Sequence, residues 1–277
     1  TYALYSGRSE FTGINMQLYD KKIIFILPML AAMVAVSGCQ PKSTAKDEQP
    51  ASSASVKEQK QAEVPVIQAK VVPVKLPKPK VCLEDGCTEY DFQTVQTNQK
   101  WINDYFTNRI KKADPNAFAN LADKPVEVPE GEPSSSQSAI YVRYLGQNYN
   151  LATFAFQTYS YSAGAAHGMS HQEFVNFDLL NKKHITVEEL IKPDVEKQLV
   201  DALFDANTNW LQEHNISREK LQLSDNFYYG ANGIVFVYPI YELASYAEGM
   251  SELTLPYFEA AKYIKPEYLP SVPNYNL

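Results

Sequence analysis

The residues best suited to chemistry lie between positions 159 and 178. The segment YSYSAGAAHG, residues 159–168, places His167 in a turn of small residues, where an imidazole can act as a general base or bind a ligand. Asp178 ends the later segment FVNFD, so Ser162, His167 and Asp178 supply the residue types of a hydrolytic triad. The sequence has no G-x-S-x-G turn to present a serine as nucleophile, which weakens that interpretation.

Three histidines in or near this region could also bind a metal ion together. His167 and His171 have the spacing of a metal-binding pair on a helix, and His184 follows. Gly164 and Gly168 disfavour a helix there, and no glutamate follows His167 as in the H-E-x-x-H motif. We therefore expect no metal and no cofactor. A histidine in such a turn can equally serve the structure, by holding the turn through backbone hydrogen bonds.

A second candidate region is rich in tyrosine and spans residues 238–246. Tyrosines are good interface anchors because they combine a large apolar area with a polar tip, but they also occur at the edge of ordinary cores. From both regions we predict a binding surface with the following candidate residues: Gly164, His167, Asp178, Tyr238, Tyr241 and Tyr246.

The elements that would position these residues follow from periodicity. Alternating residues rich in Tyr, Phe and Val predict strands, and apolar stripes at helical spacing predict helices. The strands are expected at residues 89–95, 139–145, 150–161, 174–179, 234–238 and 253–255, and the helices at 99–112, 194–214 and 256–263. Residues 146–148 should turn a hairpin, and Thr186 and Glu189 have the spacing of a capping box. Hairpins dominate over regular alternation, which predicts an α+β fold with a mainly antiparallel sheet packed by helices.

The N-terminal region is typical of an exported protein. Two lysines precede an apolar run at residues 23–36, and small residues lead to Cys39. The run is shorter than the roughly 20 residues of a membrane span, although an uncleaved membrane helix is the alternative. The ending resembles the lipobox of bacterial lipoproteins, which implies cleavage before Cys39 and attachment of acyl chains such as palmitate to it. By the same resemblance, Gln40 favours the periplasmic side of the outer membrane.

These patterns predict three parts of the chain. Residues 1–38 comprise the residues upstream of Met16 and the signal peptide. Residues 39–80 form a disordered linker rich in proline and lysine and without aromatic residues. Residues 81–277 form one globular domain, with halves at 81–161 and 162–277 and a long loop at 123–137.

The other two cysteines and the net charge limit the metals and partners that the chain is expected to bind. Outside the cytoplasm Cys82 and Cys87 are expected to form a disulfide across the Asp85–Gly86 turn, since zinc would need further ligands nearby. The formal net charge of −7 argues against nucleic acid as a partner, because phosphate binding needs a basic surface. An acidic chain suits a basic partner, although acidity is also a common device for solubility.

The combination of these segments resembles one family. The tyrosine strand, the Gly-Ala-His turn, the Asn-Phe-Asp strand and the segment YELASYAEG at residues 241–249 are similar to the domain at the C-terminus of RsiV-type anti-sigma factors and PdaC-type peptidoglycan deacetylases. The family often has a second glycine where this chain has Ala165. The resemblance implies an extracytoplasmic binding domain, which in the RsiV relatives binds lysozyme.

We therefore expect a lipid-anchored periplasmic binding protein that is not an enzyme. Its expected partners are the membrane, through the lipid, and a lysozyme-like protein or peptidoglycan. The alternatives are a hydrolase of the cell wall with His167 and Asp178 in its site, and a purely structural envelope lipoprotein.

Overall fold

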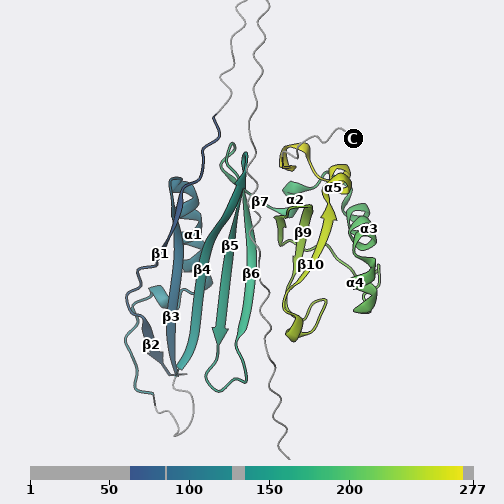
Figure 1. The fold of residues 1–277 in the computed structure, drawn as a ribbon. Helices are drawn as coiled ribbons and strands as arrows, with labels where there is room; N and C mark the ends of the chain where they lie inside the picture. The colour runs from purple at the N-terminus through teal and green to yellow at the C-terminus, as the bar shows by residue number, and fades with distance from the viewer. Residues whose placement is uncertain (1–62, 85, 127–134, 271–277) are drawn as a thin grey trace, which may run out of the picture. The chain divides into compact units, whose positions relative to one another are not determined.

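The structure is a computed structural model, and it describes residues 63–84, 86–126 and 135–270. These residues form a seven-stranded and a three-stranded sheet (Figure 1). The strands of the large sheet are β1 (Ala69–Pro73), β2 (Lys80–Leu83), β3 (Gly86–Thr97), β4 (Ser135–Asn148), β5 (Leu151–Tyr161), β6 (Met169–Asp178) and β7 (Lys183–Ile185). Their order is β1-β3-β4-β5-β6-β7, and β2 also pairs with β3.

All strand pairs of the large sheet are antiparallel except β3–β4, which is parallel. A parallel pair needs a long crossover, and helix α1 (Lys100–Ala113) supplies it. The apolar stripe of α1, with Ile102, Phe106 and Ile110 buried, packs on Phe92 and Phe154 of the sheet. The structure confirms the predicted α+β fold with a mainly antiparallel sheet, while the parallel pair was not predicted.

The small sheet has the order β10-β9-β8, with β8 at Phe227–Tyr229, β9 at Gly233–Tyr238 and β10 at Ser251–Pro256. Its helices are α2 (Val187–Leu190), α3 (Glu196–Ala206), α4 (Thr208–Glu213) and α5 (Tyr257–Tyr263). Every residue of β9 is buried, because Phe236 and its alternate neighbours contact these helices while Val235 and Val237 contact Phe174 of β6.

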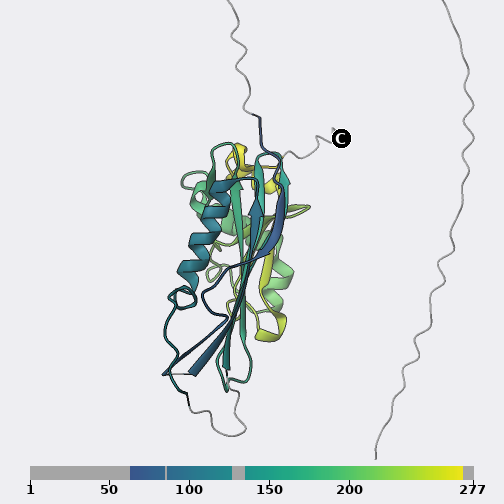
Figure 2. The same ribbon diagram turned by 90° about the vertical axis from the view of Figure 1, so that its left-hand side faces the viewer.

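The two sides of the large sheet are therefore covered differently. Phe174 and Val175 are neighbours on β6 and point to opposite faces. Val175 belongs to the core under α1, whereas Phe174 packs against the small sheet. Figure 2 shows α1 on one side of the large sheet and the C-terminal elements, in green and yellow, on the other.

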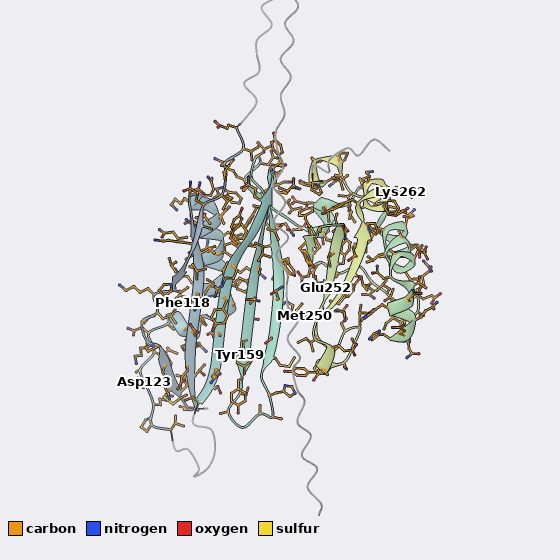
Figure 3. The ribbon with its side chains drawn as sticks, in the orientation of Figure 1. Phe118, Asp123, Tyr159, Met250, Glu252 and Lys262 are labelled. Atoms are coloured by element: carbon orange, nitrogen blue, oxygen red, sulfur yellow. A yellow bond between two sulfur atoms is a disulfide. The ribbon has the colours of Figure 1, made fainter. Side chains whose placement is uncertain are left out.

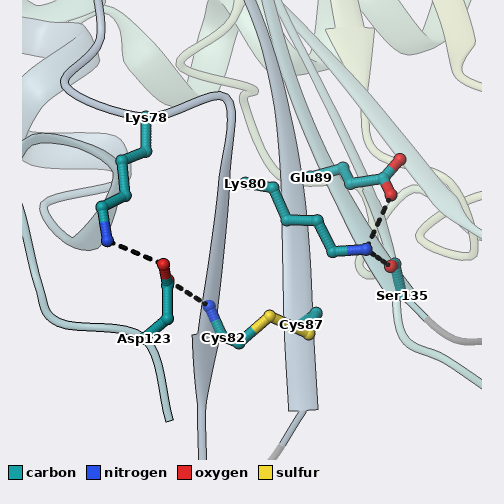
Figure 4. The surroundings of a disulfide bond; sticks show 7 residues. All are labelled: Lys78, Lys80, Cys82, Cys87, Glu89, Asp123 and Ser135. Atoms are coloured by element: carbon teal, nitrogen blue, oxygen red, sulfur yellow. Dashed lines mark hydrogen bonds and ion pairs between the residues drawn. A yellow bond between two sulfur atoms is a disulfide. The ribbon is translucent and has the colours of Figure 1, made fainter. Parts of the chain in front are cut away.

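The predicted disulfide between Cys82 and Cys87 is confirmed (Figure 4). The two residues lie directly opposite each other in the β2–β3 pair, so the bond closes the hairpin. Asp85, which we expected in its turn, lies outside the described residues. Near the bond, Lys80 Nζ contacts Glu89 at 3.2 Å and donates to Ser135 Oγ at 2.7 Å, which ties β2 to the start of β4.

Two other predictions about local structure were wrong. The turn of the β4–β5 hairpin lies at residues 149–150, because Gly146 belongs to a register shift within the strands. The helix expected at residues 194–214 is broken at Asn207. The Asn207 side chain bonds both the N–H and the C=O of Thr254 on the edge of β10, an arrangement that a continuous helix would not supply.

The predicted linker extends too far. Strand β1 pairs with β3 within residues that we expected to be disordered, and Ile67 is buried in the core. The segment is rich in proline and lysine, but β1 itself has the sequence AKVVP, and valine has a high preference for strands. The other N-terminal predictions, including Cys39, and residues 127–134 of the long loop lie outside the described residues. No helix in the described part of the chain has the length and hydrophobicity needed to cross a membrane.

Candidate functional site

The side of the large sheet that faces away from α1 is only partly covered by the small sheet. The uncovered part forms a cleft of about 850 Å³, which we call the groove. It crosses β3, β4, β5 and β6 and is closed on one side by Ile240, Gly249 and Met250. Tyr159 of β5 and Met250, both labelled in Figure 3, line it from the large sheet and from the segment that precedes β10.

Strand alternation explains why the groove is polar. Phe92, Val142 and Phe154 point to the core under α1, so their neighbours point to the groove. These outward positions carry carboxylate, phenol and amide side chains, namely Glu89, Asp91, Tyr141, Gln157, Tyr159 and Gln172. The sequence contained this signal as polar residues at every second position of the strands, but we did not select any of them as site residues.

Tyr141 is held in a defined orientation. Its hydroxyl donates to Asp91 Oδ2 at 2.6 Å, and this hydrogen bond is the main reason why the pKa of Tyr141 is raised. The guanidinium of Arg143 lies 5.3 Å from the centre of the Tyr141 ring and donates to Gln93 Oε1. The ring therefore forms a fixed part of the groove wall rather than a mobile surface side chain.

A pair of amides crosses from β5 to β6. Gln157 Nε2 donates to Gln172 Oε1 at 2.5 Å. The backbone N–H of Gln172 contacts Met250 Sδ at 3.3 Å, and its carbonyl accepts from Asn226 Nδ2 at 2.8 Å. Asn226 also accepts from the Phe174 N–H, so its side-chain amide pairs with β6 as a neighbouring strand would. Strand β7 pairs only with residues 176–178 of β6, so Asn226 fixes the earlier part of β6, on which the groove is built.

The charge of the groove is mildly negative. Glu89, Asp91 and His171 line it, and none of the described lining residues is a lysine or arginine. Both carboxylates already have partners, because Glu89 contacts Lys80 and Asp91 accepts from Tyr141. The lining therefore disfavours an anionic ligand and offers mainly hydrogen bonds.

Three of the predicted binding residues meet beside the groove. The rings of His167 and Tyr246 lie 4.3 Å apart with their planes tilted by 32°, and Tyr241 lies 5.7 Å from Tyr246. All three side chains are exposed, Tyr241 at 58% and Tyr246 at 38%. We call these three residues the aromatic cluster. Gly164 lies in the same turn as His167 and has a φ of +82°, a conformation that favours glycine.

Gly168 connects the cluster to the groove. Its carbonyl accepts from the Tyr246 hydroxyl and from His167 Nδ1, each at 3.1 Å. A Cβ atom at Gly168 would overlap the outer atoms of the Tyr159 ring, so the absence of a side chain lets Tyr159 pack there. Tyr159 lines the groove, and the cluster therefore continues its wall.

Tyr241 adopts a backbone conformation that is uncommon for a large side chain. Its φ is +75°, in a turn closed by the Glu242 N–H and the Pro239 carbonyl. Glycine or asparagine usually occupies such a position, and another residue costs about 1–2 kcal/mol. Strain of this kind at an exposed aromatic residue motivates a functional hypothesis for Tyr241.

The turn that carries Tyr246 is fixed by a contact that sequence analysis missed. Ser245 and Glu248 form a capping box around the short 3₁₀ helix Tyr246–Glu248. Glu248 also contacts His214 Nε2 at 2.6 Å, while His214 Nδ1 lies 2.8 Å from the Trp210 carbonyl. Both ring nitrogens face acceptors, so this geometry favours protonated histidine. The contact with Glu248 raises the pKa of His214 and lowers that of Glu248.

Asp178 lies elsewhere and has a structural role. It is buried at the far end of β6, about 30 Å along the strand from the turn of His167. Its carboxylate accepts from Leu180 N, Asn181 N and Asn181 Nδ2 and contacts Asn150 Nδ2. The structure therefore does not bring Ser162, His167 and Asp178 together, which removes the triad and the hydrolase site built on His167 and Asp178.

Tyr238 was also placed wrongly on the binding surface. It is fully buried under the helices of the small sheet, and its hydroxyl donates to the Gln222 carbonyl at 2.8 Å. Burial is the main cause of its raised pKa. The strand alternation that buries Ile234 and Phe236 also buries Tyr238.

A second, smaller cavity of about 420 Å³ contains His171, His184, Arg109 and Glu173. Arg109 forms an ion pair with Glu173, whose pKa is raised by burial despite this partner. Burial lowers the pKa of His184. Within the described ranges, no three His, Cys, Asp or Glu side chains are grouped so as to hold a metal ion.

Comparisons with known proteins establish the following likeness. Residues 178–258 match the model of a family described as "Protein of unknown function (DUF3298)", and no curated protein matches the sequence. The chain is similar to the crystal structure of a DUF3298 family protein from Pseudomonas aeruginosa PAO1, with 18% identity, a TM-score of 0.58, and coverage of 76% of this chain and 99% of that one. It is also similar to a DUF3298 member from Bacteroides fragilis NCTC 9343, with 16% identity, a TM-score of 0.50, and coverage of 74% and 96%. The structural relatives thus show the fold, and residues 178–258 correspond to a domain of unknown function.

Proposed function

We propose that this chain is a binding protein of the bacterial cell envelope that holds its ligand at the groove and the aromatic cluster. One observation carries the proposal. His167 comes from one sequence segment and Tyr241 and Tyr246 from another, and the three candidate residues meet in one exposed cluster beside a cleft of about 850 Å³. Exposed tyrosines that are held in place are typical anchors of binding surfaces.

The location and the partners in this proposal come from the sequence. The segment around Cys39 motivates a lipid anchor and a periplasmic position at the outer membrane. The similarity to RsiV-type and PdaC-type domains motivates a lysozyme-like protein or peptidoglycan as the partner. The net charge of −7 is compatible with a basic protein such as lysozyme, through complementary charge.

Binding of the intact chain to hen lysozyme and to purified peptidoglycan tests the proposal. Tyr241→Ala and Tyr246→Ala should each weaken binding of the true partner at least tenfold, because anchor residues dominate affinity. Tyr149→Ala is a matched control, since Tyr149 is 55% exposed, has a φ of +50° and lies at the opposite end of β5. Equal affinity of all three variants and the parent chain for both partners would refute the proposed site.

A further inference from the structure

We propose that the ligand of the groove is a neutral, linear chain of pyranose sugars. This inference rests on the proposed function and names the class of ligand that the same site accepts. It follows from three properties of the groove: its hydrogen-bonding groups, its aromatic surface and its charge.

The polar groups of the groove match those of a sugar. A sugar hydroxyl both donates and accepts a hydrogen bond, so it pairs well with side-chain amides, which also do both. Gln157 and Gln172 present such amides side by side, and Gln137 presents a third on β4. The hydroxyls of Ser170 and Tyr159 add further donors and acceptors. An apolar ligand would leave these groups without partners on binding, at a cost in free energy.

The aromatic groups supply the apolar part of the contact. Each face of a pyranose ring carries C–H groups that can pack flat against an aromatic ring. Tyr159 presents a ring inside the groove, and Tyr246 with His167 presents a tilted pair beside it. Because the Gly168 carbonyl accepts from Tyr246 and from His167, these rings lose little additional freedom when a ligand binds.

The charge of the groove favours a neutral sugar chain over the other classes of ligand. A phosphate-rich or sulfated polymer would meet Glu89 and Asp91 with no lysine or arginine among the described lining residues. A basic peptide would need carboxylates that are available to it. Here Lys80 contacts Glu89, and the Tyr141 hydroxyl bonds Asp91. Hydrogen bonding therefore outweighs charge in this groove, which favours a neutral glycan over a basic protein.

The dimensions of the groove suit a linear ligand. It crosses four adjacent strands, β3 to β6, which at about 4.8 Å between neighbours gives a width of about 14 Å. The aromatic cluster extends this surface beyond the end of β6. A short oligosaccharide can therefore contact the amides of the groove and the cluster together.

Calorimetric titration of the intact chain in detergent with a neutral hexamer of β-1,4-linked N-acetylglucosamine tests the inference. We expect binding whose affinity changes less than twofold between 50 and about 300 mM salt, since a neutral ligand is not screened. Gln157→Leu and Tyr246→Ala should each weaken it at least tenfold, and Tyr149→Ala should leave it unchanged. Thermal unfolding of each variant shows whether a loss of affinity comes from misfolding. The salt series uses only the parent chain, so it tests the inference even if a variant fails to fold.

The outcomes distinguish this inference from the broader proposal. Lysozyme binding that depends on Tyr246 and weakens with salt, together with no binding of the hexamer, would overturn the glycan and retain the binding site. Hexamer binding that Gln157→Leu and Tyr246→Ala leave unchanged would place the sugar elsewhere and overturn the inference. No binding of hexamer, peptidoglycan or lysozyme would overturn both proposals. Release of shorter sugars from the hexamer would show catalysis and contradict a role in binding alone.

Discussion

Candidate binding residues lie at both ends of β6, but they are buried at one end and exposed at the other. At one end the Asp178 carboxylate is buried and has four hydrogen-bonding contacts from its own chain. At the other end His167 and Tyr246 are exposed, and their ring centres lie 4.3 Å apart. A polar group whose bonding capacity is filled by the fold stabilises the fold, whereas an ordered group with exposed surface remains available to a ligand.

The largest expected effect tests this difference directly. Asp178→Ala leaves the N–H groups of Leu180 and Asn181 without their acceptor, and we expect the free energy of unfolding to fall by about 2–3 kcal/mol. His167→Ala should change it by less than about 0.5 kcal/mol, as is usual at an exposed site. Urea denaturation of both variants measures the contrast. A larger loss for His167→Ala would reverse the roles that we assign to the two ends.

The Asp178 carboxylate should also make the free energy of unfolding depend on pH. Burial by itself raises the pKa of Asp178, but the hydrogen bonds from Asn181, Asn150 and Leu180 outweigh it and hold the pKa below its ordinary value of 3.8. A lowered pKa stabilises the folded state above the unfolded pKa, and this contribution is lost as pH falls through the folded pKa. The stability difference between the parent chain and Asp178→Asn should therefore shrink below about pH 3.8. A difference that is constant down to pH 2 would contradict this assignment.

The next effect concerns backbone strain in the aromatic cluster. Tyr241→Gly and Tyr241→Ala both remove the ring, but only glycine relieves the cost of a φ of +75°. The glycine variant should be more stable than the alanine variant by about 1 kcal/mol, and both should bind ligand equally weakly. Urea denaturation and the binding titration give the two quantities. Equal stability of the two variants would remove strain as an argument for the function of Tyr241.

Much of the large sheet could be predicted from local pattern. Helix α1 follows from Ile102, Phe106 and Ile110 at helical spacing, and β4 and β5 from their alternating residues. The break at Asn207 could not be predicted, because it depends on pairing with Thr254, 47 residues away. Strand β1 was missed for a related reason, since its partner β3 is distant in sequence and the composition of the segment indicated disorder.

The site was predictable in part. The cluster residues could be selected because exposed glycine-flanked and tyrosine-rich segments are visible in the sequence. The sequence does not show that these residues meet. Asp178 is excluded because it lies at the other end of β6, and Tyr238 because it lies on the buried helix-facing side of β9. A one-residue shift reverses the face of a strand, so burial of one tyrosine among several is decided by register rather than by residue type.

A smaller effect on stability tests the link between the cluster and the groove. Gly168→Ala places a methyl group where the outer atoms of the Tyr159 ring lie. The ring can swing away, so we expect a loss of about 1 kcal/mol in the free energy of unfolding, at the low end of the cost of added bulk. The affinity for the hexamer should nevertheless fall, because Tyr159 leaves the groove wall. Unchanged affinity would show that Tyr159 and the cluster do not act as one surface.

The smallest effect concerns the turn that carries Tyr246. Glu248 raises the pKa of His214 above its ordinary value of 6.5, with weaker contributions from the Trp210 carbonyl and from Glu213. A raised histidine pKa stabilises the folded state below the unfolded pKa, and this contribution is lost as pH rises through the folded pKa. The lowered pKa of Glu248 has the opposite sign, so its contribution is lost as pH falls below about 4.5. The pair should therefore hold the turn best between about pH 4.5 and 6.5.

Titration of the histidine ring protons by NMR measures this contact without a ligand. The pKa of His214 should fall in Glu248→Gln and change less in Glu213→Gln, a control that removes a nearby carboxylate of the same type. If the contact also positions Tyr246, the ring protons of Tyr246 should shift with the same apparent pKa, because Ser245 and Glu248 enclose that turn. A His214 titration that leaves the Tyr246 signals unmoved would confine the contact to local stability. The order of the cluster would then rest on the hydrogen bonds to the Gly168 carbonyl.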